Sequence, residues 1–118
     1  MAKHAQYAGP RDRLDLYEQL VATLPGVERK GRTLPYTSVN GHMVSFLTEG
    51  GSLALRLSPA DRAEFIERYH TSLHEAHGTV MKEYVATPDE LLADIGTLGP
   101  WFAAGHAYVA SLTPKRSR

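Results

Sequence analysis

The chain has 118 residues, which is enough for one domain with a single hydrophobic core. Its 13 basic and 13 acidic side chains balance, so no overall field directs it to nucleic acid, and we expect neither nucleic acid nor a membrane as a partner. It contains no cysteine and no apolar run approaching the roughly 20 residues of a transmembrane helix, which excludes disulfides and thiolate metal sites and predicts a cytoplasmic globular protein.

The first half of the chain predicts a helix followed by three strands. Apolar residues recur every three or four positions over residues 12–24, as in an amphipathic helix, and Pro25-Gly26 ends it. Over residues 27–57 the apolar period changes to two. The dipeptide Asn40-Gly41 favours a type I′ turn, and a second turn lies at "EGGS", residues 49–52. These turns are too short for parallel crossovers, so the strands are predicted to be antiparallel.

The second half predicts a helix, two strands and a final helical region. Ser58 is placed to cap a helix that starts at Pro59 and ends near Tyr69. Two short strands follow, the better one over residues 79–86.

In "TPDE", the spacing of Thr87 and Glu90 predicts a capping box at the start of the last helical region, residues 91–112. That region is predicted to break at Gly99-Pro100, because proline cannot continue the hydrogen-bond ladder.

The element order is therefore α-β-β-β-α-β-β-α, which belongs to the α+β class. The economical architecture has two layers, an antiparallel sheet of about five strands with helices packed on one face. We expect a single domain over residues 1–118, with its core over about 12–112 and loose ends at 1–11 and 114–118.

No catalytic constellation is found, and neither an enzymatic activity nor a cofactor is expected. The sequence has no GxSxG elbow and no glycine-rich phosphate loop, and its paired carboxylates lie at predicted helix starts. The weak metal candidates are His70, His74 and His77, at spacings of four and three. They would share a face only on a continuous helix, which Gly78 and the preceding polar residues argue against, so no metal site is predicted. A metal-dependent enzyme built on them remains the third alternative.

Polar residues on the uncovered sheet face are the remaining candidates. In "VMKEYV" strict alternation places Val80, Lys82 and Tyr84 on one face and Met81, Glu83 and Val85 on the other. The basic stretch "ERKGR" at 28–32 adds two cations beside this face. The predicted ligand- or partner-binding residues are Arg29, Lys30, Tyr36, Arg56, Lys82 and Tyr84. The alternative is an ordinary solvated sheet face with cross-strand pairs.

Three sequence segments, taken in their order along the chain, resemble a known family: "RKGRTLPYTSVNGHMVSFL", "GSLALRLSPADRAEFIERY" and "HGTVMKEYVATPDELL". Over residues 14–112 the chain resembles the small bacterial proteins grouped with the TfoX N-terminal domain, close to the MmcQ/YjbR-like class. The resemblance implies an antiparallel sheet with flanking helices, similar to secretion chaperones. Full-length TfoX proteins regulate competence genes and carry a second, C-terminal domain. Val44 departs from the pattern, since similar members tend to have an aromatic residue there.

These observations favour a non-enzymatic, cytoplasmic interaction or regulatory module that acts through protein contacts. The partner would be another protein or a second copy in a homodimer. The alternative function is binding of a small anionic metabolite on the open sheet face, where Arg29, Lys30 or Lys82 would meet the anion.

Overall fold

The computed structural model describes residues 6–114 and contains a single five-stranded sheet. The helices are α1 (Arg11–Val21), α2 (Pro59–Tyr69), α3 (Asp89–Leu92) and α4 (Ile95–Ala110). The strands are β1 (Tyr36–Val39), β2 (His42–Leu47), β3 (Leu53–Arg56), β4 (Leu73–Ala76) and β5 (Thr79–Thr87). Their order across the sheet is β1-β2-β3-β5-β4, and every neighbouring pair is antiparallel. The α+β class and the antiparallel sheet are thus confirmed.

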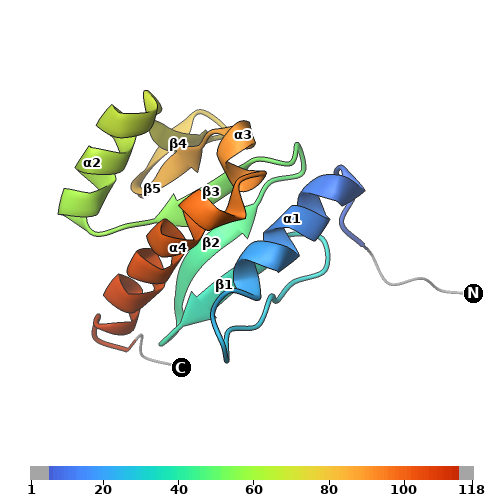
Figure 1. Ribbon diagram of the computed structural model, residues 1–118, viewed down its shortest axis with the longest axis horizontal. Coiled ribbons are helices and arrows are strands. Elements are labelled where there is room, and N and C mark those ends of the chain that lie inside the picture. Colours follow the sequence, from blue (N-terminus) through green and yellow to red (C-terminus); the bar gives the residue numbers. More distant parts are fainter. Residues whose placement is uncertain (1–5, 115–118) are drawn as a thin grey trace, which may run out of the picture.

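The helices α1 and α4 lie side by side across one face of the sheet (Figure 1). The apolar stripe of α1, which includes Leu14 and Leu20, faces the sheet, and α4 contributes Phe102 and Val109 to the same core. The helix α2 closes one end of this layer through Phe65, whose ring packs edge-on against Trp101 of α4 at 5.1 Å between centroids. Burial of these side chains in one continuous cluster is the main stabilising contribution to the fold.

Two of the three hairpins, β1–β2 and β4–β5, turn through two residues in the left-handed region. Asn40 and Gly41 have φ of 56° and 80°, which confirms the predicted turn between β1 and β2. His77 and Gly78 have φ of 54° and 77° and join β4 to β5 in the same way.

The helix α2 begins and ends as predicted. The Ser58 hydroxyl accepts a hydrogen bond from the backbone N–H of Asp61 at 3.2 Å, and Pro59 occupies the first helical position. The helix ends at Tyr69, because His70 adopts the left-handed conformation that terminates many helices.

Two predictions about the last helical region are wrong. Thr87 does not cap a helix, since it is the last residue of β5, pairs with Leu53 and is only 4% exposed. Pro88 takes the N-cap position of α3 instead, and no side chain caps it.

Pro100 does not break α4 either. Proline removes only the hydrogen bond to the carbonyl of Gly96, which is exposed and open to water. The helical region is interrupted earlier, between α3 and α4.

The ends of α1 and β1 and the position of Tyr7 also differ from expectation. The helix α1 ends at Val21 rather than at residue 24, because the next residues form tighter i→i−3 hydrogen bonds. The first strand begins only at Tyr36, and of the residues before it Lys30 alone makes an isolated bridge. Tyr7, expected in a loose end, is buried and its hydroxyl donates to the carbonyl of Thr48 at 2.5 Å. Arg11, also expected in a loose end, is the first residue of α1. Residues 1–5 and 115–118 of the expected loose ends lie outside the described residues.

A glycine lets α4 approach the sheet closely. Gly105 is buried, and a Cβ atom there would lie 2.5 Å from the carbonyl oxygen of Arg56 at the end of β3.

Within residues 6–114 none of the helices has the length and hydrophobicity needed to cross a bilayer.

Candidate functional site

The sheet face opposite α1 and α4 is called the open face here, and one cross-strand row defines it. Tyr36, Phe46, Ala54 and Ala86 are paired across β1, β2, β3 and β5. Successive side chains of a strand point to opposite faces, so the row beginning at Ser45 points the other way. The Ser45 hydroxyl indeed meets the hydroxyl of Tyr17 from α1 at 2.7 Å.

Three of the predicted site residues lie on this open face. Tyr36 belongs to the defining row, and Arg56 is the cross-strand partner of Tyr84. The Arg56 guanidinium forms an ion pair with Glu83 and its side chain is only 15% exposed. The Tyr84 hydroxyl donates to the carbonyl of Met43 at 2.8 Å. Arg56 therefore ties β3 to β5, and Tyr84 ties β5 to β2 across β3. Among the described residues only the buried Nε of Arg56 lacks a hydrogen-bond partner in this pair.

Burial is the main cause that raises the pKa of Tyr84 above its ordinary value of 10.0, and the Arg56 charge partly offsets it. The phenol thus stays protonated and keeps its hydrogen bond at neutral pH.

The other three predicted cations are separated. The Arg29 guanidinium binds Glu18 of α1 at 2.6 Å. The Lys30 ammonium donates to the hydroxyl of Ser38 at the β1 edge of the sheet, 3.1 Å away. Lys82 is exposed and lies in β5, which is separated from β1 by two intervening strands, β2 and β3. The structure therefore does not bring these cations together around one ligand position on the open face.

The three histidines are distributed over different elements. His70 follows α2, His74 lies in β4, and His77 lies in the turn after β4. Over residues 6–114 there is no group of three or more His, Cys, Asp or Glu side chains placed to hold a metal ion.

The hollow on the open face lies between the β4–β5 hairpin and the loop that joins β2 to β3. We call it the apolar groove, and its volume is about 860 Å³. The apolar side chains that line it are Leu34, Met43, Phe46, Leu73, Ala76, Met81 and Ala86. Its charged lining residues are Glu49 and Glu75, and no lysine or arginine of residues 6–114 lines it. Leu34 is 46% exposed and adds to the apolar surface that lines the groove.

Two β-bulges shape the apolar groove. In β2 the pairing shifts at Val44, so Val44 joins the core and Met43 reaches the open face. In β5 the pairing shifts between Met81 and Val85, because Leu73 pairs with Val85 while the next residue of β4 pairs with Met81. A bulge breaks the alternation of side chains and bends the strand. Met81 therefore lines the groove while Val85 is in the core, and strict alternation, which put them on one face, was wrong.

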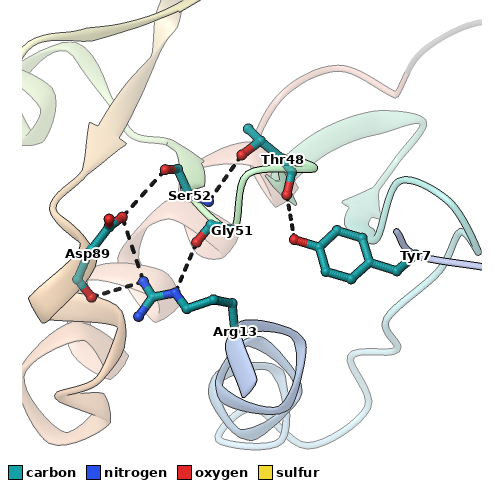
Figure 2. Close-up of polar contacts among 6 residues, drawn as sticks. All are labelled: Tyr7, Arg13, Thr48, Gly51, Ser52 and Asp89. Carbon is teal, nitrogen blue, oxygen red and sulfur yellow. Dashed lines mark hydrogen bonds and ion pairs between the residues drawn. The ribbon is translucent and has the colours of Figure 1, made fainter. Parts of the chain in front are cut away.

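A cluster of polar contacts fixes one wall of the apolar groove (Figure 2). The Arg13 guanidinium donates to the carbonyls of Gly51 and Asp89, at 3.0 and 2.9 Å. The Thr48 hydroxyl accepts from the backbone N–H of Ser52 at 3.0 Å. We call this cluster the arginine clasp. It joins α1, the β2–β3 loop and the start of α3, so the loop residues that line the groove are held in place.

The arginine clasp has the character of a structural contact. The Ser52 hydroxyl lies 3.4 Å from a carboxylate oxygen of Asp89, but no histidine belongs to the clasp to relay a proton. The Arg13 charge instead neutralises the carboxylate, at 3.7 Å.

His74 forms part of the groove wall. Its ring packs edge-on against Phe46, with 5.2 Å between centroids, and burial lowers the pKa of His74 below its ordinary value of 6.5. The imidazole of His74 is therefore neutral at physiological pH and does not offset the carboxylates of Glu49 and Glu75.

Comparisons with protein-family models, with curated proteins and with solved structures found no match for this chain.

Proposed function

We propose that this protein is a non-enzymatic interaction module whose apolar groove binds an extended, basic segment of another protein. The proposal agrees with the regulatory or interaction role that the resemblance to the TfoX N-terminal domain implies. A chain without cysteine suits a reducing compartment, and we place its action in the cytoplasm.

The observation that carries the proposal is an apolar groove beside an edge strand. The strand β4 is last in the sheet order, and Leu73 and Ala76 of β4 line the groove. An extended segment that pairs with such an edge gains main-chain hydrogen bonds, and its alternate side chains enter the adjacent pocket. The exposed Leu34 and the two methionines supply a surface that such side chains would cover.

The charges of the apolar groove select the kind of partner. Glu49 and Glu75 line it without a compensating lysine or arginine. Lysine or arginine side chains flanking the apolar residues of the partner would be attracted, whereas an anionic metabolite would be repelled. The small-anion alternative is therefore not supported on the open face.

A designed peptide pair tests this proposal. One peptide alternates leucine with lysine, and the other, of equal length, alternates leucine with glutamate. We expect the lysine peptide to shift the NMR resonances of β2, β4 and β5, and the glutamate peptide to shift them much less at equal concentration.

Two substitutions that add the same charge provide the control. Met81→Lys places a positive charge in the groove, whereas Gln19→Lys adds it at an exposed position of α1 that does not line the groove. Binding of the lysine peptide should be lost in Met81→Lys and kept in Gln19→Lys. Three results would each refute the proposal. They are equal binding of the lysine peptide by both variants, resonance shifts confined to α1 and α4, and sedimentation showing that a second copy of this chain covers the groove.

A further inference from the structure

We propose a second binding site, for a small phosphate-bearing anion, in a pocket on the α1 side of the molecule. This arginine pocket has a volume of about 300 Å³ and is lined by Gln6, Tyr7, Arg11, Leu14, Arg29 and Arg32. It shares no lining residue with the apolar groove, so the two proposals stand or fall separately.

The three guanidinium groups come from different segments. Arg11 is the first residue of α1, whereas Arg29 and Arg32 come from the "ERKGR" stretch before β1. Two backbone hydrogen bonds between Lys30 and Tyr36, at 2.7 and 2.9 Å, close the loop that carries Arg32. The basic stretch that the sequence singled out is thus folded back onto the start of α1.

Arg29 is the fixed member of the set. Its guanidinium is held by Glu18 and by the carbonyl of Gly31, so its orientation is set before any ligand arrives. A group held in this way loses little conformational freedom on binding.

Arg11 and Arg32 are the two arginines of the pocket whose guanidinium groups are available to a ligand. Among residues 6–114 neither one makes a hydrogen bond or an ion pair with another side chain, and no carboxylate lines the arginine pocket. Glu18 neutralises one of the three charges, and the two others repel each other when they face a common hollow. A bound anion would remove that repulsion.

The chemistry of the lining matches phosphate oxygens. Guanidinium groups present planar pairs of N–H donors that bind phosphate in a bidentate manner. Buried Tyr7 and Leu14 form an apolar base, which lowers the local dielectric and strengthens such contacts. The small volume, at the lower end of the range for ligand pockets, limits the ligand to a compact molecule.

Titration with inorganic pyrophosphate tests the site, with sodium chloride at matched ionic strength as the reference because salt screens exposed charges. We expect pyrophosphate to raise the melting temperature, since a ligand that binds only the folded state stabilises it. We also expect it to shift the NMR resonances of residues 6–14 and 29–32.

Single-charge variants locate the effect. Arg32→Gln should weaken pyrophosphate binding by about tenfold or more, the loss expected for one charge-assisted contact. Lys30→Gln removes the same charge from the same stretch, but the ammonium of Lys30 points to Ser38 and not into the pocket, so its binding should equal that of the wild type. The melting temperatures of both variants without ligand show whether they are folded.

Three results would overturn the proposal: no binding of pyrophosphate above the chloride reference, equal weakening in Arg32→Gln and Lys30→Gln, or resonance shifts confined to the open face. Titration with citrate is a further test. If this tricarboxylate bound as tightly as pyrophosphate, the pocket would recognise negative charge in general, and the assignment to phosphate would be refuted.

Discussion

Three hydroxyl groups meet inside the otherwise apolar core. The Ser45 hydroxyl lies 2.7 Å from that of Tyr17 and 2.6 Å from that of Thr37, and all three residues are fully buried. Burial raises the pKa of Tyr17 to about 12, so the phenol keeps its proton at physiological pH. Ser45 is the centre of this network, since both other hydroxyls depend on it.

We predict that Ser45→Ala destabilises the protein more than Tyr17→Phe does. Tyr17→Phe leaves Ser45 and Thr37 paired and should cost about 1 kcal/mol, whereas Ser45→Ala leaves two buried hydroxyls without partners and should cost about 2 to 3 kcal/mol. Urea denaturation measures both. The double variant should cost less than the sum, and strictly additive or equal single costs would contradict the network.

A second residue-scale prediction concerns pH. Because the pKa of His74 is lowered in the folded state, the unfolded chain takes up this proton first as the pH falls below about 6.5. The stability contributed by neutral His74 is therefore present above that pH and lost below it. We expect the wild type to lose more stability than His74→Gln between pH 7.5 and 5.5 in urea denaturation. Parallel losses in the two proteins would count against this.

At the scale of elements, local signals determined most of the fold. The Asn40-Gly41 turn, the Ser58 cap and the end of α2 near Tyr69 rest on backbone chemistry within a few residues, and all were predictable. The errors arose where tertiary contacts override local preference. Thr87 has the spacing of a cap, but its pairing with Leu53 keeps it in the sheet.

The contact between α4 and β3 gives an element-scale prediction. Gly105→Ala would place a methyl group 2.5 Å from the carbonyl oxygen of Arg56, and the helix must move away from the sheet. We expect a loss of about 2 kcal/mol or more, as for other overpacked cores.

Gly96→Ala is the matched control in the same helix. Its added methyl group would meet nothing closer than 3.9 Å, so it should be neutral or stabilise by up to about 1 kcal/mol through helix propensity. Thermal denaturation of the two variants compares them directly, and similar melting temperatures would show that the close approach of α4 is not needed.

At the scale of the whole molecule, the apolar groove could not have been predicted from the sequence. Two bulges decide to which face of the sheet Met43 and Met81 point, and the alternation of side chains along a strand does not predict a bulge. The six residues chosen from their charge or phenol groups do not line it. No local signal marked the groove: Met43 stands beside Val44 and Met81 beside Val80, so their neighbours in sequence do not distinguish them from core positions.

The arginine clasp ties distant parts of the chain together and gives a prediction at this scale. Arg13→Gln removes bonds to two carbonyls that lie 38 and 76 residues away in sequence. We expect a loss of about 1 to 3 kcal/mol. Hydrogen exchange at the amides of Gly51 and Ser52, which bond to Thr48, should accelerate.

Arg11→Gln is the control for the clasp, because it removes an exposed guanidinium two residues away that has no partner in the described part of the chain. Its stability should equal or slightly exceed that of the wild type, because the repulsion from Arg32 is removed, and its exchange rates at residues 48–52 should match the wild type. If the two variants behaved alike, the clasp would not be the contact that holds the groove wall.

The His77–Gly78 turn offers a way to watch the apolar groove directly. A Cβ atom at Gly78 would meet nothing within 4 Å, so the tip of the hairpin projects into solvent, and the next residue, Thr79, is exposed. Because the natural chain has no cysteine, Thr79→Cys would create a unique thiol for a fluorescent dye. Thr79 pairs with Ala76 in the groove wall, so the emission of that dye would report occupancy of the groove in real time.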